Sequence, residues 1–179
     1  MHRLQQRLYR SLRIPTRQDW RQTLIVLVVY GAIALPIAIH FQLFTWSPWP
    51  AAQFWSGSGL KLILGTLFLP ALAEEIIFRV LLLPHPSETI RLRIVLLWIG
   101  MSLGLFMVYH PLNALTLFPH GNPTFFQPVF LSLAGLLGFA CTMLYRQTGS
   151  LWTIVLVHWF VVVIWLGLGA GAALLNWAN

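Results

Sequence analysis

Residues 71–80, with the sequence ALAEEIIFRV, place three ionisable side chains inside a predominantly apolar run that extends over residues 60–83. The whole chain has only four acidic residues, and two of them, Glu74 and Glu75, are adjacent here, with Arg79 close behind. Charged side chains are costly inside a membrane and mark functional sites there. This stretch therefore predicts a membrane helix and a functional site, and partners for its carboxylates must come from other apolar segments.

The composition is that of a membrane protein. Of the 179 residues, 58% are hydrophobic and 8% are charged, whereas soluble domains have about 25% charged residues. We expect an all-α, polytopic bundle of transmembrane helices, formed as a single domain by residues 22–179 after a basic amphipathic segment, residues 1–21. The single Cys141 excludes an internal disulfide, and its apolar surroundings in sequence predict a buried thiol.

Much of the formal net charge of +7 comes from residues 1–21, which hold six Arg and one Asp. Basic charge beside a membrane span contacts anionic lipid and sets topology, so we expect no nucleic-acid partner. A helix over residues 2–14 would separate arginines from apolar side chains. The two sets are Arg3, Arg7, Arg10 and Arg13 against Leu4, Leu8, Tyr9 and Leu12. We expect this helix to lie on the cytoplasmic leaflet with its arginines at anionic lipid; a disordered basic tail is the alternative.

Five apolar segments follow, each near the ~20 residues that cross the hydrocarbon core of a bilayer. They are predicted at residues 22–41, 60–83, 94–112, 126–145 and 151–175. Basic residues occur in alternate connections, which predicts an integral, multi-pass protein with a cytoplasmic N-terminus. Two small-residue pairs predict close approach of helices. They are Gly100-x-x-x-Gly104 and Gly167-x-x-x-Gly171.

Helix geometry divides the two carboxylates of the opening stretch. Glu75 and Arg79 are four positions apart, about 40° around the helix axis, so they can form an ion pair. Glu74 lies about 140° from Arg79 and needs a different partner. Pro70 removes the helical hydrogen bond to the Thr66 carbonyl, which predicts a kink.

Two histidines in other apolar segments are the expected partners of Glu74. His110 ends the sequence FMVYH of residues 106–110, and His158 lies early in the last segment. The remaining histidines fall in the tail, at a helix end or in loops, where we expect interfacial or solvated side chains. They are His2, His40, His85 and His120.

A carboxylate and two imidazoles in one cavity fit several kinds of site. Glu74 could take a proton from a water that attacks a carbonyl, while a histidine orients the water or stabilises the oxyanion. Glu74, His110 and His158 could instead bind a divalent metal ion such as zinc. The same groups could form a buried charge network that holds helices together, or a path for a transported cation. The first and fourth segments carry no charged residue that would extend such a path.

The order of these motifs resembles the CPBP intramembrane proteases, which include the CAAX prenyl protease 2 (type II) enzymes and bacterial Abi-type proteins. The family pattern is Glu-Glu-x-x-x-Arg, then Phe-x-x-x-His, then His-x-x-x-Asn/Asp, on successive membrane helices. This chain has EEIIFR at residues 74–79 and FMVYH at residues 106–110. The third motif begins at His158, after the similar lead-in TGSLW at residues 148–152. Each motif is weak by itself, but the three in order are specific, and the resemblance covers about residues 60–165.

The resemblance implies an endopeptidase that hydrolyses a peptide bond of a protein or peptide substrate in a cavity open to the cytoplasm. It also implies a role for each matching residue. Glu74 with His110 would activate the hydrolytic water. Glu75 and Arg79 would keep the site in shape, and His158 would help to form the oxyanion hole.

One position departs from the family pattern. The third motif ends in Asn or Asp, but this chain has Val162, which cannot donate a hydrogen bond. Loss of one oxyanion donor typically lowers the rate by ~10²–10³. The alternative to a protease is therefore a catalytically degenerate member that acts as a membrane interaction or scaffold protein.

Overall fold

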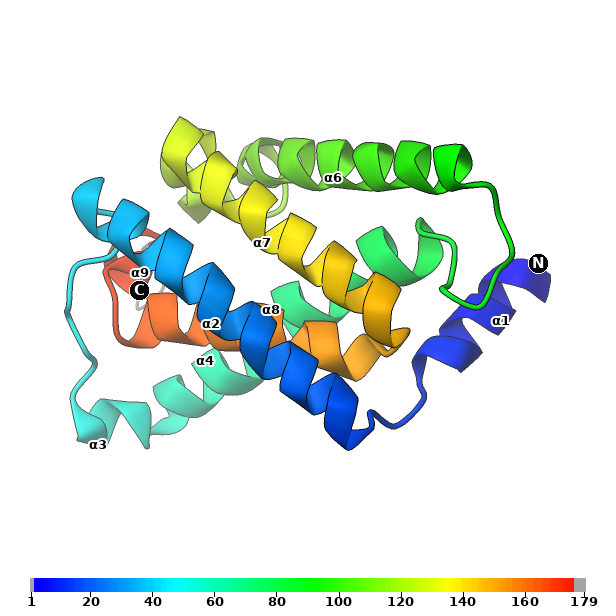
Figure 1. The fold of residues 1–179 in the computed structure, drawn as a ribbon. Coiled ribbons are helices and arrows are strands. Elements are labelled where there is room, and N and C mark those ends of the chain that lie inside the picture. The colour runs from blue at the N-terminus through cyan, green and yellow to red at the C-terminus, as the bar shows by residue number, and fades with distance from the viewer. Residues whose placement is uncertain (1, 176–179) are drawn as a thin grey trace.

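The computed structural model describes residues 2–175, which form helices and connecting segments and contain no β-strand (Figure 1). The expected all-α bundle is therefore confirmed. The elements are α1 (His2–Ser11), α2 (Arg17–His40), α3 (Ala51–Phe54), α4 (Gly57–Thr66), η1 (Leu67–Leu72), α5 (Ala73–Glu75), η2 (Ile76–Leu81), α6 (Leu92–Leu115), η3 (Pro119–Gly121), η4 (Thr124–Phe126), α7 (Pro128–Thr148), α8 (Leu151–Gly167) and α9 (Gly171–Leu174).

The five predicted apolar segments correspond to α2, to the run from α4 to η2, and to α6, α7 and α8. Three of these helices, α2, α6 and α7, are long and apolar enough to cross a membrane, and α8 is a shorter apolar helix of 17 residues. Helix α2 begins before the predicted residue 22 because Thr16 and Asp19 form a capping box at its start. The chain is an integral membrane protein.

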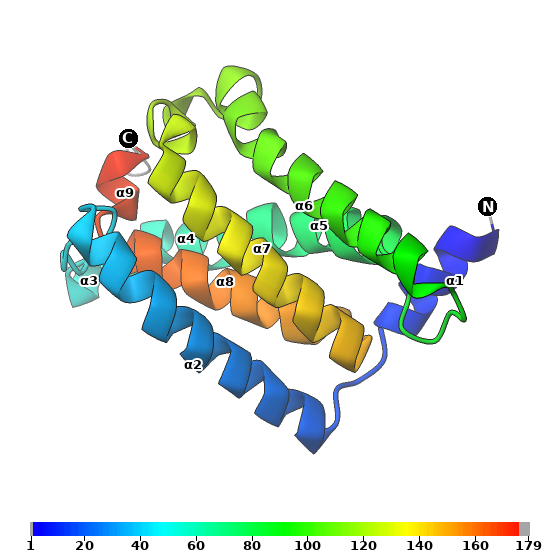
Figure 2. The same cartoon turned by 45° about the horizontal axis from the view of Figure 1, so that its top comes forward.

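Helix α8 is the centre of the bundle. Helices α2 and α7 pack along it, α4 packs against another side, and α6 lies outside α7 (Figures 1 and 2). Its side chains Ile154 and Val157 are fully buried in the larger apolar core, together with Ala71 and Leu144. A second apolar cluster, near the other end of α8, includes Leu62 and Phe125. An apolar helix that is buried around most of its circumference needs no amphipathic pattern, and α8 shows none.

The segment that carries the opening motif is broken rather than merely kinked. Leu69 has φ −134° and ψ 108°, which lies outside the helical region, and Pro70 follows it. Proline removes a helical donor and its ring disfavours helical geometry in the preceding residue. The kink predicted at Pro70 is therefore confirmed, and the structure shows it as a complete break in the helix. Wider helical turns, η1 and η2, lie before and after the glutamates.

The predicted end of the last span is wrong. We expected residues 151–175 to be one helix, but α8 ends at Gly167 and the chain turns before α9. Backbone amides of the α2–α3 connection take up the freed carbonyls, because Ser47 N–H donates to Leu168 O and Trp49 N–H donates to Gly167 O, both at 3.0 Å. Glycine-rich sequence has low helix propensity, so these bonds replace a further helical turn.

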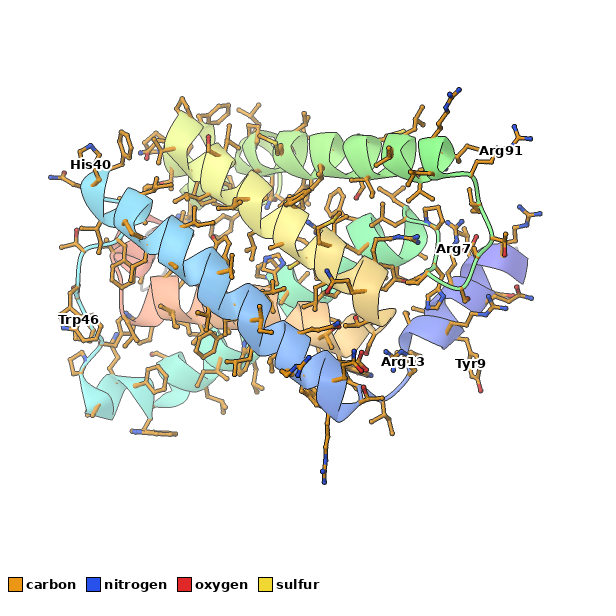
Figure 3. The ribbon with its side chains drawn as sticks, in the orientation of Figure 1. Arg7, Tyr9, Arg13, His40, Trp46 and Arg91 are labelled. Carbon is orange, nitrogen blue, oxygen red and sulfur yellow. The ribbon has the colours of Figure 1, made fainter. Side chains whose placement is uncertain are left out.

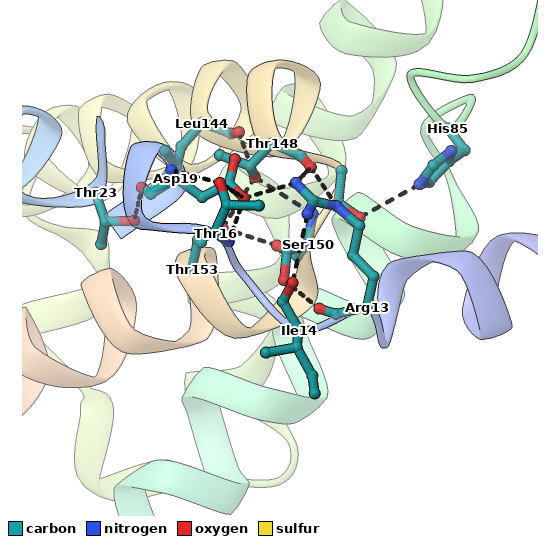
Figure 4. Close-up of polar contacts among 11 residues, drawn as sticks. Arg13, Ile14, Thr16, Asp19, Thr23, His85, Leu144, Thr148, Ser150 and Thr153 are labelled. Atoms are coloured by element: carbon teal, nitrogen blue, oxygen red, sulfur yellow. Dashed lines mark hydrogen bonds and ion pairs between the residues drawn. The ribbon is translucent and has the colours of Figure 1, made fainter. Parts of the chain in front are cut away.

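The N-terminal segment is ordered against the bundle, so the predicted helix is confirmed and the disordered tail is wrong. Arg13 donates to the Thr148 carbonyl and to Asp19, and Ser150 Oγ donates to the Arg13 carbonyl at 3.0 Å (Figure 4). Arg7 forms an ion pair with Glu88 at 2.7 Å. Helix α1 ends at Ser11, three residues before the predicted end.

The predicted helix contact at Gly100 and Gly104 is wrong. A Cβ atom built at either position would meet no atom within 4 Å apart from the adjacent residues and the nearby backbone of its own helix. These glycines lie on α6, much of whose surface is exposed in the bundle. Gly171 does approach a neighbour closely, since a Cβ there would lie 2.7 Å from the Trp165 ring.

Candidate functional site

The broken second segment delivers both glutamates to the interior. Glu75 and Arg79 are completely buried, whereas Glu74 retains 6% exposure. They lie beside α8, which η1 and α5 contact directly. Because the backbone leaves the helical region at Leu69, the helical segment that carries the motif does not continue α4. It packs along α8.

Glu75 is the most heavily bonded group of the site. Arg79 Nη1 donates to its Oε1 at 3.2 Å, as the spacing of four residues predicted. His158 Nδ1 lies 2.7 Å from the same oxygen. An ionised carboxylate only accepts hydrogen bonds, so as the ionised partner of Arg79 Glu75 accepts this bond and the His158 imidazole donates it through Nδ1. His158 was expected as a partner of Glu74, and the structure places its shortest contact on Glu75.

Glu74 is held more loosely. Its Oε2 lies 3.8 Å from His158 Nε2, beyond the length of a direct hydrogen bond. Within residues 2–175 this oxygen has no hydrogen-bond partner. The predicted division of the motif is therefore confirmed for Glu75 and Arg79, while His158 lies between the two carboxylates with one ring nitrogen toward each.

His110 is buried and has one polar contact on its own helix. Its Nδ1 lies 2.9 Å from the Phe106 carbonyl. A carbonyl only accepts, so Nδ1 carries the hydrogen and Nε2 is left as an acceptor in the neutral ring. The Phe106 ring contacts both histidines, with centroid distances of 4.8 Å to His110 and 6.2 Å to His158. The structure thus brings His110 to the same cluster through Phe106, and it shows no direct bond from His110 to Glu74.

Sequence reasoning missed how two residues shape the site. The guanidinium carbon of Arg79 lies 4.2 Å from the centroid of the Phe106 ring, a cation–π contact. Gly138 of α7 leaves room for that arrangement, because a Cβ there would lie 2.7 Å from Arg79 Nη2 and 3.0 Å from the Phe106 ring. Phe106 was identified as the first residue of the Phe-x-x-x-His motif, but the motif alone assigned it no contact with Arg79. Nothing in a single sequence marks Gly138 among 13 glycines.

The structure also describes three other residues that the sequence analysis singled out. Cys141 is a buried core thiol, as expected. Val162 packs against the second apolar cluster, so no polar group occupies the family's Asn/Asp position. His85 was expected to be interfacial or solvated; it is buried at the end of the bundle, and its Nε2 lies 3.3 Å from the Gly149 carbonyl. Burial, together with the nearby Arg10 and Arg146, lowers the pKa of His85, while the Gly149 carbonyl and Glu88 act against that shift.

The site does not fit a metal ion. Across residues 2–175, no group of three or more His, Cys, Asp or Glu side chains is arranged to hold one. Glu74, His110 and His158 therefore do not form the metal-binding set that the sequence left open.

Comparison with known proteins identifies the family. Neither the curated proteins nor the solved structures gave a match. The sequence model of one family, described as type II CAAX prenyl endopeptidase Rce1-like, matches residues 53–164. That range starts in α3, ends in α8 and contains Glu74, Glu75, Arg79, His110 and His158. The match covers more than half of the chain, so the protein belongs to the Rce1-like family of type II CAAX prenyl endopeptidases.

Proposed function

We propose that this protein is an intramembrane endopeptidase in which Glu74 activates the water that hydrolyses a peptide bond. The observation that carries the proposal is the position of His158 between the two glutamates, at 2.7 Å from Glu75 and 3.8 Å from Glu74. One carboxylate fixes the imidazole. The other is left without a direct bond and is free to exchange a proton.

In the proposed mechanism both glutamates are negatively charged and Arg79 and His158 are positively charged. Two ionised glutamates, Arg79 and a protonated His158 would together carry no net charge, which limits the cost of burying them. A protonated His158 keeps one N–H on Glu75 and turns the other toward the space beside Glu74. An N–H in that position can donate to the oxygen of a substrate carbonyl as negative charge develops on it.

The reaction then needs two proton transfers at Glu74. Glu74 takes a proton from water as the water oxygen bonds to the carbonyl carbon, and His158 donates to the resulting oxyanion. Glu74 then gives the proton to the leaving nitrogen as the C–N bond breaks, which yields a carboxylic acid and an amine. His110 Nε2 accepts a hydrogen bond from the attacking water and orients it, since its Nδ1 hydrogen is held by the Phe106 carbonyl.

The test compares the wild type with Glu74→Gln in proteoliposomes supplied with a library of membrane-inserted and CAAX-type peptides. Glu88→Gln is the matched control, because it makes the same chemical change in an ion pair at the end of the bundle. We expect wild type and Glu88→Gln to give the same cleavage products and Glu74→Gln to give none. Equal cleavage by all three proteins would refute the proposal.

Val162 favours a second candidate function, a membrane interaction protein that keeps the polar cluster for packing. The second oxyanion donor of the family is absent at this position, and the valine packs among apolar side chains. Under this alternative, Glu74→Gln leaves the cellular phenotype of the protein intact. The first proposal predicts that the same variant behaves as a deletion of the protein.

We also propose that the arginine-rich end of the bundle faces the cytoplasm, with the N-terminus on that side. The positive-inside rule supports this orientation, since Arg91 precedes α6 and Arg146 lies in the last turn of α7, both at the same end as α1. A cysteine introduced at Arg3 should then be labelled by an impermeant thiol reagent only in inverted vesicles.

A further inference from the structure

Positive charge is concentrated at one end of this bundle. Figure 3 shows Arg7, Arg13 and Arg91 at that end and His40 and Trp46 at the opposite end. Nine of the eleven Lys and Arg residues belong to the arginine-rich end: Arg3, Arg7, Arg10, Arg13, Arg17, Arg21, Arg91, Arg93 and Arg146. The acidic residues there, Asp19 and Glu88, are each bonded to an arginine.

The arginines of this end have two kinds of environment. Some make contacts within the protein. Arg7 binds Glu88, Arg13 binds the Thr148 carbonyl, and Arg146 donates to the Pro84 carbonyl at 2.7 Å. Others, including Arg3 and Arg10, are exposed. The exposed set is excess positive charge that the local carboxylates do not balance.

Helix α1 also exposes apolar side chains. Its buried edge carries Ser11, which is completely buried, and the largely buried Arg7. Beyond this edge Leu4 is 49% exposed and Tyr9 is 81% exposed, and Leu12, the residue that follows α1, is 45% exposed. A helix that exposes both charged and apolar side chains is typical of the membrane interface.

A groove connects the charged and the apolar side chains. It has a volume of about 660 Å³, lies between α1 and the segment that follows η2, and is lined by Tyr9, Arg10, Leu12, Arg13, His85 and Ser87. Arg10 Nη1 donates to Ser87 Oγ at 2.8 Å, which places its guanidinium at the groove. Guanidinium groups beside apolar side chains suit a phosphate ester attached to acyl chains.

We propose that α1 and this groove bind the headgroup of an anionic phospholipid from the leaflet at the arginine-rich end. The phosphate lies at Arg10 with Arg3 near by on the same helix face, and Tyr9 and Leu12 enter the glycerol and upper acyl region. The surface does not depend on the proposed protease activity, because none of its residues belongs to the buried site.

The test measures lipid binding to the purified full-length protein in detergent by native mass spectrometry. Phosphatidylglycerol is compared with phosphatidylcholine, in the wild type, in an Arg3→Gln/Arg10→Gln variant and in an Arg91→Gln/Arg93→Gln control with the same charge change away from the groove. We expect the wild type and the control to prefer phosphatidylglycerol and the Arg3/Arg10 variant to bind it about 10-fold to 30-fold more weakly. Equal loss in both double variants, or no preference for the anionic lipid, would overturn the proposal.

Two further measurements distinguish lipid binding from phosphate binding and locate α1 relative to the membrane. Inorganic phosphate at the same concentration should not displace the bound lipid; displacement would show a phosphate site rather than a lipid site. A fluorophore attached through Leu12→Cys reports the position of α1, since the native Cys141 is buried. Brominated phosphatidylglycerol in nanodiscs should quench it, and absence of quenching would mean that Leu12 lies outside the membrane interface.

Discussion

The centre of the bundle and its arginine-rich end use the same side chains with different consequences. At the centre Arg79 pairs with Glu75, and both are completely buried. At the end Arg7 pairs with Glu88, with side chains 15% and 20% exposed. Breaking a buried pair leaves an uncompensated charge in a medium of low polarity, whereas the partly exposed side chains of Arg7 and Glu88 keep some contact with water. The comparison teaches that burial, more than the identity of the partners, sets what each pair contributes to stability.

The largest effect is expected at the central pair. Arg79→Ala should lower the free energy of unfolding by about 3–5 kcal/mol, because Glu75 would stay buried without the arginine that offsets its charge. The control Arg93→Ala, at an exposed position of α6, should change it by less than about 0.5 kcal/mol. Unfolding in mixed detergent micelles, followed by circular dichroism, measures both. Similar losses in the two variants would break the comparison.

Gly138→Ala tests whether the packing around Arg79 matters as well as its charge. The added methyl group would overlap Arg79 Nη2 and the Phe106 ring, and overpacking of this kind costs about 1–3 kcal/mol. Gly104→Ala is the matched control on α6, where a Cβ meets nothing within 4 Å. The same unfolding assay should show a loss only for Gly138→Ala, and an unchanged Gly138→Ala would mean that Arg79 can move without cost.

The two neighbouring glutamates sharpen the comparison within the centre. Glu75→Gln should be clearly destabilising, because it weakens bonds to both Arg79 and His158. Glu74→Gln should be less destabilising than Glu75→Gln, because it removes one of the charges that balance Arg79 and His158 but no direct hydrogen bond, since Glu74 Oε2 lies 3.8 Å from His158 Nε2. Thermal unfolding of both variants in one detergent checks the order. The opposite order would assign the structural role to Glu74.

The smallest effect is expected at the end of the bundle. Burial raises the pKa of Glu88, but hydrogen bonds from Arg7 and from the His85 amide outweigh burial and bring the pKa below its usual 4.5. The pair therefore stabilises the fold above the unfolded-state pKa, and this contribution disappears as pH falls through the lower folded-state pKa.

Glu88→Gln should accordingly lower the free energy of unfolding by about 0.5–1 kcal/mol at neutral pH. The difference from the wild type should shrink steadily as the pH is lowered below about 4.5. Urea or detergent unfolding at several pH values measures this difference. A difference that stays constant over that range would show that Glu88 acts through something other than its charge.

The sequence predicted the centre of the molecule better than its edges. Glu75 and Arg79 pair as their spacing predicted, because an i, i+4 contact is decided within one helix. His158 was found as a partner, but its preference for Glu75 depends on how α8 rotates against the broken second segment. Gly138 could not be predicted, since its role lies in the space that it leaves to residues from two other helices. The end of α8 at Gly167 was also missed, because it is set by hydrogen bonds from residues over a hundred positions earlier.

The tight connection between α7 and α8 has a consequence for how this protein enters the membrane. Only Gly149 and Ser150 join the two helices, and Gly149 has the left-handed φ of 64° that ends α7. A connection of two residues is too short for α7 to span the bilayer while α8 remains outside it. The two helices must therefore insert together as one helical hairpin. Gly138 of α7 and His158 of α8, which both lie against the Glu75–Arg79 pair, then belong to one inserting unit.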